Sequence, residues 1–131
     1  LVLVACAGIA GRRERALEET LAEYAEVMRW GRLDRLSAFQ RREAGEVSDA
    51  KPGWHGVRVT QYEVIEPARR FAAANGDEDD RDDHEDKAVQ SVRIEYVRPD
   101  QTVRVLRDDQ VWRYHEDDKR WYRQDPLPAF E

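Results

Sequence analysis

Residues 89–124 read VQSVRIEYVRPDQTVRVLRDDQVWRYHEDDKRWYRQ, and this stretch decides the fold. Apolar and polar residues alternate through two long runs and one short run, which is the pattern of β-strands that bury one face. The segments RPDQ and EDDK separate the runs with residues that favour turns. The stretch therefore predicts a three-stranded antiparallel meander.

The first turn sets the register of the two long strands. A three-residue loop at 99–101 pairs Ile94 with Leu106 on the buried face, whereas a two-residue loop inverts the faces. Two adjacent acids at 108–109 interrupt the second run, and a β-bulge there would reconcile the two registers. The sequence leaves the choice between these alternatives open.

Helices precede the sheet in the chain. From Arg12 to about Arg29, apolar residues recur at intervals of three and four, which is typical of an amphipathic α-helix. These residues are Leu17, Leu21, Tyr24, Ala25 and Met28. Gly31 suits the left-handed backbone that follows a helix. A short second helix is expected from about Leu33 to Arg42. Its buried residues are expected to be Leu33, Leu36 and Phe39 or Ala38.

The middle of the chain alternates between loops and a strand. Residues 44–56 contain proline and glycine breakers and predict a loop. Residues 57–66 alternate and are rich in β-branched side chains, so they predict a strand that Pro67 ends. Residues 68–76 either extend the sheet or form a helical turn. Residues 77–86 hold eight acids and one base, which predicts a solvated acidic loop.

Length and charge limit the classes of protein to which this chain can belong. A chain of 131 residues is one domain by length. We assign that domain to residues 12–131, as an α+β fold in which two helices pack on a curved antiparallel sheet. The net charge is −6, but the chain outside the acidic loop carries only +1. Nucleic acid is therefore not an expected partner, because phosphate binding requires a basic face.

Cys6 is the single cysteine, so an intrachain disulfide or a cysteine-based zinc site is excluded. The segment Leu3-Val4-Ala5-Cys6 resembles a bacterial lipobox. Residues 1–11 would then be a signal-peptide remnant, lipobox and tether, and fatty acyl chains such as palmitate on Cys6 would hold the domain on a membrane. This predicts a lipoprotein of the bacterial cell envelope that faces the periplasm. The alternative is a cytosolic protein whose apolar N-terminus is a strand with an inert thiol.

The later part of the chain carries a resemblance to a known family. Residues 12–130 resemble a small NTF2-like domain, of the cystatin-type α+β class, and more closely the uncharacterised bacterial lipoproteins built on that plan. The matching residues are Trp30, Gly31, Leu106, Arg107, Gln110, Trp112, Trp121, Pro126, Leu127, Pro128 and Phe130. The resemblance implies a bent sheet around a long helix, with a conical cavity between them. Some NTF2-like proteins are isomerases or dehydratases, and many are binding or scaffold modules.

Nine residues are candidates to line that cavity. They are Tyr24, Met28, Tyr62, Ile94, Tyr96, Leu106, Gln110, Trp112 and Tyr114. Buried aromatic residues are more often ordinary core, so a filled space is the competing interpretation. A filled space favours a non-catalytic binding or scaffolding role. An open cavity favours a small-molecule-binding or isomerase-like enzyme.

The sequence offers few candidates for catalytic residues. An isomerase of this fold needs a carboxylate base in an apolar cavity. Asp108, at the expected bulge, and Asp34 are the candidates, and we assign neither as catalytic. His55, His84 and His115 lack the short spacings of metal sites, so no metal or cofactor is expected.

Arginines are frequent in the meander and predict a basic outer face. They are Arg93, Arg104, Arg107, Arg113, Arg120 and Arg123. Acids interleaved with them favour a ladder of charge pairs across the strands. The alternative is a docking face for an acidic partner or for the acidic loop of a second copy. We expect a homodimer through the sheet and, through Cys6, contact with a membrane.

Overall fold

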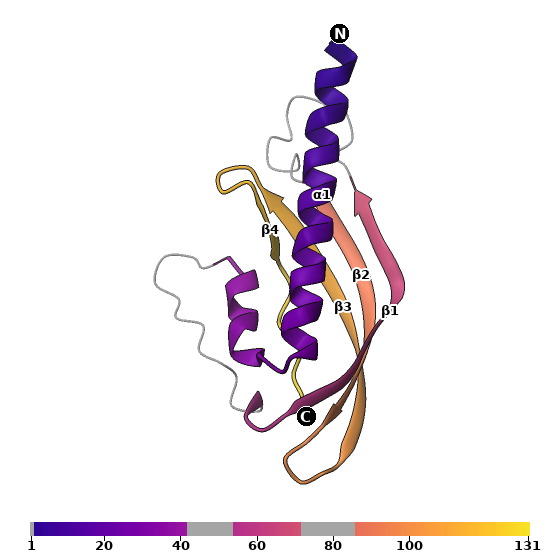
Figure 1. Ribbon diagram of the computed structural model, residues 1–131, viewed down its shortest axis with the longest axis vertical. Coiled ribbons are helices and arrows are strands. Elements are labelled where there is room, and N and C mark those ends of the chain that lie inside the picture. Colours follow the sequence, from indigo (N-terminus) through magenta and orange to yellow (C-terminus); the bar gives the residue numbers. More distant parts are fainter. Residues whose placement is uncertain (1, 42–53, 72–85) are drawn as a thin grey trace.

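The computed structural model describes residues 2–41, 54–71 and 86–131, with side chains from Gly11 onward. The helices are α1 (Val2–Arg29) and the 3₁₀ helix η1 (Leu33–Phe39), and the strands are β1 (Arg58–Phe71), β2 (Lys87–Val97), β3 (Val103–His115) and β4 (Arg120–Arg123). All neighbouring strands pair antiparallel in the order β1-β2-β3-β4. Both helices lie on one side of this bent sheet, which confirms the predicted α+β class (Figure 1).

Helix α1 is longer than the sequence predicted. It ends at Arg29, as expected, but it begins at Val2 rather than at Arg12. The ten earlier positions include several alanines, which have the highest helix propensity, so the helix extends into the segment expected to be a tether. The second helix ends at Phe39, short of the predicted Arg42. It buries Leu33, Leu36 and Phe39 and leaves Ala38 exposed.

The β2–β3 hairpin adopts the register set by a three-residue loop. Ile94 pairs with Leu106. The backbone N–H of Arg98 donates to the carbonyl of Thr102 at 2.9 Å, which leaves residues 99–101 as the loop. Gln101 has a φ of 70°, the left-handed conformation that three-residue hairpin loops require. Of the two registers that the sequence leaves open, the structure has the one set by a three-residue loop.

The bulge expected at 108–109 does not form. Pairing between β2 and β3 runs without a shift from Lys87 opposite Arg113 to Val97 opposite Val103. Asp108 therefore follows the alternation of its strand and faces inward, where it is only 5% exposed. The acid stays in the sheet because a buried partner compensates its charge, as shown in the next subsection.

Strand β1 does not end at Pro67. It continues to Phe71, so residues 68–71 extend the sheet. Pro67 lies within a register shift between Glu66 and Arg69. Because β1 is an edge strand, a proline at such an irregularity removes no hydrogen bond from the sheet interior.

The core lies between the helices and the sheet, and its largest fully buried side chains are Trp112, Trp121, Tyr24, Met28, Leu36, Ile94, Gln110 and Val92. The C-terminal segment closes one end, where Leu127 and Phe130 are buried. The indole N–H of Trp54 donates to the carbonyl of Pro128 at 2.9 Å. These contacts join segments that are far apart in the sequence into one core.

One end of the predicted acidic loop belongs to this body. Residues 77–85 lie outside the described residues, but Asp86 is only 4% exposed. Its carboxylate pairs with Arg13 at 3.1 Å and with Arg70 at 2.6 Å. The prediction that the whole run is solvated is therefore wrong at Asp86, because ion pairs with two guanidinium groups offset the free energy of removing its charge from water.

Candidate functional site

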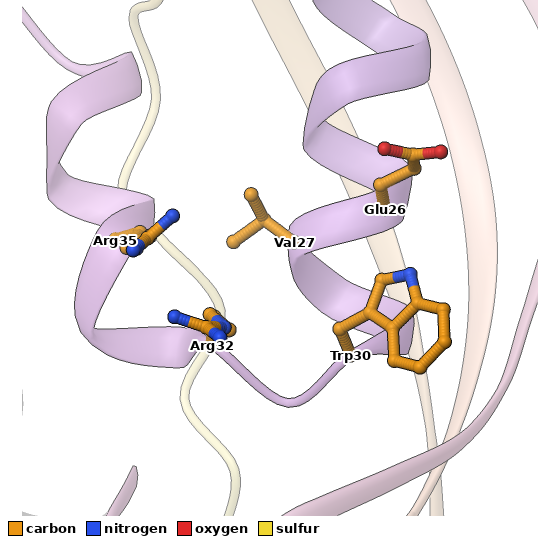
Figure 2. Close-up of a pocket in the computed structure, with 5 residues that line it drawn as sticks. All are labelled: Glu26, Val27, Trp30, Arg32 and Arg35. Carbon is orange, nitrogen blue, oxygen red and sulfur yellow. The ribbon is translucent and has the colours of Figure 1, made fainter.

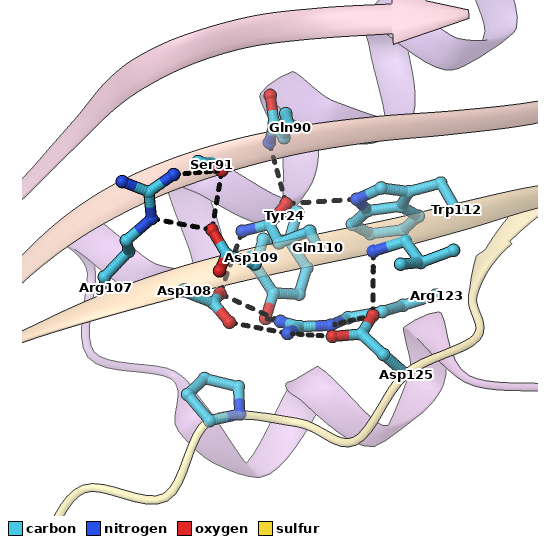
Figure 3. Close-up of polar contacts among 12 residues, drawn as sticks. Tyr24, Gln90, Ser91, Arg107, Asp108, Asp109, Gln110, Trp112, Arg123 and Asp125 are labelled. Atoms are coloured by element: carbon cyan, nitrogen blue, oxygen red, sulfur yellow. Dashed lines mark hydrogen bonds and ion pairs between the residues drawn. The ribbon is translucent and has the colours of Figure 1, made fainter. Parts of the chain in front are cut away.

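A buried arginine is the centre of a polar cluster under the sheet (Figure 3). Arg123 of β4 is 2% exposed, and all five of its N–H donors make hydrogen bonds. Two go to Asp108 at 2.5 and 2.9 Å, two to Asp125 at 2.8 and 3.0 Å, and one to the hydroxyl of Tyr24 at 2.7 Å. The expectation that Arg123 lies on the outer face is wrong, because β4 pairs it with the inward-facing Trp112.

Gln110 extends the cluster along β3. Its amide nitrogen donates to Asp108 at 2.9 Å and to the hydroxyl of Tyr62 at 3.0 Å. Its amide oxygen accepts from Gln90 at 2.7 Å and from the indole N–H of Trp112 at 3.0 Å. Both donors and both acceptor positions of this buried amide are used, so it has no capacity left for a ligand.

Burial shapes the proton equilibria of the cluster. Burial alone lowers the pKa of Arg123, but the hydrogen bond to Asp125 and the nearby charges outweigh it and raise the pKa above the ordinary value. Burial raises the pKa of Tyr24 well above its usual range. Burial also raises the pKa of Tyr62 to about 12, despite the opposing hydrogen bond from Gln110. Both tyrosines are therefore neutral at ordinary pH.

The two candidate bases are placed differently. Asp108 is buried, but both of its oxygens accept hydrogen bonds from Arg123. A general base needs a free lone pair within reach of a substrate proton. Asp34 is on η1 and is exposed to solvent. The structure therefore brings neither acid into an apolar cavity.

The predicted cavity residues come together, but they contact one another. Tyr24, Met28, Tyr62, Ile94, Tyr96, Gln110, Trp112 and Tyr114 are buried, and Leu106 is partly buried. The ring of Tyr24 lies edge-on to Trp112, with centroids 5.2 Å apart, and edge-on to Phe39 at 5.1 Å. Tyr62 adds a third ring, 6.5 Å from Tyr24. This packing occupies the space between α1 and the sheet.

Three hollows lined by described residues open to the surface. The first, with a volume of 100 Å³, is lined by Arg13, Arg41, Asp86, Tyr114, His115, Glu116 and Asp117. The second, of 520 Å³, is lined by Ala38, Gln40, Arg41, Asp118 and Tyr122. The third, of 440 Å³, is lined by Glu26, Val27, Trp30, Arg32 and Arg35 (Figure 2). Tyr114 is the one predicted cavity residue that lines any of these three.

Sequence reasoning missed the third hollow. Trp30 is singled out from the sequence only as part of the NTF2-like resemblance, yet its side chain is 79% exposed. A tryptophan beyond the buried stripe of an amphipathic helix, followed by arginines two and five positions later, is a weak signal that the sequence does contain. It becomes informative only when the turn after α1 is known.

Metal and membrane-spanning features are not found in the described part of the chain. No group of three or more histidine, cysteine, aspartate or glutamate side chains there is placed to hold a metal ion. No helix among the described residues is long and apolar enough to cross a membrane. The side chain of Cys6 and residue His84 lie outside what the structure describes.

Comparisons of the chain with family models, with curated proteins and with solved structures found no match. The resemblance to NTF2-like domains therefore stays a prediction.

Proposed function

We propose that this chain is a lipid-anchored domain of the bacterial cell envelope that binds or scaffolds other molecules and does not catalyse a reaction. We place it among NTF2-like domains whose interior is packed. The observation that carries the non-catalytic part is the pairing of Asp108 with Arg123 inside a filled core. An inward carboxylate would be the base of an NTF2-like isomerase, but the charge of Asp108 is neutralised by its ion pair with Arg123.

Because the interior is filled with side chains, we place the proposed binding site on the surface. Small-molecule sites are usually concave and enclose most of their ligand. The rings of Tyr24, Tyr62 and Trp112 occupy the place where such a site would lie. Removing one ring tests this: Trp112→Ala should create a space that takes up an apolar dye, whereas the unchanged protein should bind little. Strong dye binding by the unchanged protein, quenched by substrate-like steroids, would support the enzyme alternative instead.

The anchor part of the proposal depends on Cys6. The first turns of α1 extend beyond the sheet, so an acyl group there would hold the body away from the bilayer (Figure 1). Mass spectrometry of the protein from the membrane fraction of a bacterium that produces it tests the anchor. The expected result is an acylated peptide that begins at Cys6, lost in Cys6→Ser. Unmodified Cys6 in soluble protein would contradict it.

Exposed valines on the outer face of the sheet support the proposal that one binding partner is a second copy of the chain. Val103 and Val105 lie on this face, opposite Val97 and Glu95 of β2, and are 58% and 52% exposed. Exposed valines on neighbouring positions form an apolar patch that a homodimer would cover. Further along the same face, Arg107 pairs with Glu66 at 3.0 Å and with Asp109 at 2.9 Å. Asp109 lies on the same strand as Arg107, Glu66 lies two strands away on β1, and the residue directly opposite Arg107 on β2 is Arg93.

A further inference from the structure

The turn after α1 presents a tryptophan and two arginines around an open hollow of 440 Å³ (Figure 2). Trp30 is 79% exposed, whereas Trp54, Trp112 and Trp121 are all buried. Among the five residues around the hollow, only Val27 is partly buried, so its floor is apolar and its rim is solvated. An indole left in water beside an apolar floor is a feature of docking surfaces.

The backbone holds Trp30 in a fixed position. The N–H of Gly31 donates to the carbonyl of Met28 at 3.2 Å, and the N–H of Arg32 donates to the carbonyl of Val27 at 3.0 Å. With a φ of 69° at Gly31, this is the Schellman arrangement that ends many helices. The tryptophan and the first arginine therefore stand on a hydrogen-bonded turn, so binding has to order their side chains but not their backbone.

The two arginines lie on one side of η1. Residues three apart eclipse one another in a 3₁₀ helix, and the N–H of Arg35 donates to the carbonyl of Arg32 at 3.0 Å. Leu33 and Leu36, one position after each arginine, are buried and hold an adjacent side of η1 against the core. No carboxylate within the described residues pairs with either guanidinium group. With Glu26, the hollow carries a charge of +1 on a protein whose net charge is −6.

We propose that this hollow docks a partner protein through a short segment that carries carboxylates next to an apolar or aromatic side chain. Arg32 and Arg35 would form charge-assisted hydrogen bonds with the carboxylates, and the apolar side chain would pack on Trp30 and Val27. Tryptophan and arginine are the residues that dominate protein–protein binding energies. The solvated rim fits an extended segment better than a small molecule, which needs an enclosing pocket.

Position separates this site from the membrane. Cys6 and Trp30 are at opposite ends of α1, about 35 Å apart along the helix axis. If α1 stands upright on a bilayer that holds an acylated Cys6, the hollow lies far from the headgroups, whereas a helix lying flat would bring Trp30 to them, and the vesicle comparison below separates the two arrangements. This inference rests on the proposed binding role, and it places the bound partner at the far end of the domain from the anchor.

Selection from a displayed library of random dodecapeptides on the immobilised full chain tests the proposal. The expected result is enrichment of peptides with aspartate or glutamate beside an apolar or aromatic residue. Their affinity should fall about 30-fold in Trp30→Ala, the loss that a tryptophan hot spot gives. It should fall at least 10-fold in Arg32→Glu/Arg35→Glu. Binding should also protect Trp30 from acrylamide quenching, because the other three tryptophans are already buried.

The matched control is Arg12→Glu/Arg15→Glu, which makes the same charge change on exposed positions at the other half of α1. This variant should keep the affinity of the unchanged chain. No enrichment of acidic peptides, equal loss in both charge-reversed variants, or better binding of anionic phospholipid vesicles than of the selected peptides would overturn the proposal. Mass spectrometry reports the acylation of Cys6 independently of peptide binding, so either the anchor or the docking site can be disproved without the other.

Discussion

Replacing Arg123 by methionine should cost a large share of the free energy of unfolding. Methionine keeps most of the side-chain volume but removes all five hydrogen bonds to Asp108, Asp125 and Tyr24. Asp108 is 5% exposed and would be left as an unpaired buried carboxylate. Breaking one side of a buried ion pair typically costs about 3–5 kcal/mol. A domain of this size has about 5–15 kcal/mol in total.

Urea unfolding followed by circular dichroism measures this loss. With a slope of about 2 kcal/mol per molar urea, a loss of 4 kcal/mol lowers the midpoint by about 2 M. The double variant Arg123→Met/Asp108→Asn removes the stranded charge and keeps an oxygen for Gln110, so it should regain about half of the lost stability. A loss below about 1 kcal/mol in the single variant, or no recovery in the double variant, would refute the reasoning.

Three further predictions concern other parts of the molecule. Burial raises the pKa of Tyr62 to about 12 and raises that of Tyr24 as well. The stability that these neutral tyrosines contribute should be complete below pH 10 and should fall as the pH rises from 10 to 12, and the phenolate absorbance of both should appear at a higher pH than that of a free tyrosine. Gly31→Ala should cost about 1–2 kcal/mol in thermal unfolding, because φ is positive there. If the sheet forms a homodimer, Val103→Lys/Val105→Lys should halve the mass seen by light scattering, and a single-chain mass for the unchanged protein would exclude that dimer.

The meander could be predicted because its information is local. Alternation along residues 89–115 specifies the strands, whereas the turn residues at 99–101 leave two registers, of which the structure has the one that pairs Ile94 with Leu106. The amphipathic spacing before Arg29 and the glycine that follows specify the end of α1 for the same reason. The predicted stop at Pro67 failed because a proline's effect depends on whether its strand is at an edge, which is a property of the whole sheet.

The polar cluster could not be predicted from local pattern. The expectation of a bulge at Asp108 came from two adjacent acids that interrupt the run and from the two registers that a bulge would reconcile, whereas an inward-facing carboxylate needs a buried partner. Its partner is Arg123, fifteen residues later on a strand of only four residues. The alternation of so short a strand is set by the turn before it, and the sequence does not reveal how that turn closes. Asp86 was misread in the same way, because Arg13 and Arg70 come from distant elements.

The cluster also explains how the parts of the domain are aligned. Arg123 connects β4 with Asp108 of β3 and with Tyr24 of α1, so one side chain fixes a strand, its neighbour and the helix that covers them. A residue shift in β4 would turn Arg123 to solvent and leave Asp108 without its partner, which makes the shifted pairing costly. The polar contacts under the sheet therefore act in specifying the structure, and the binding chemistry that we propose belongs to the surface around Trp30.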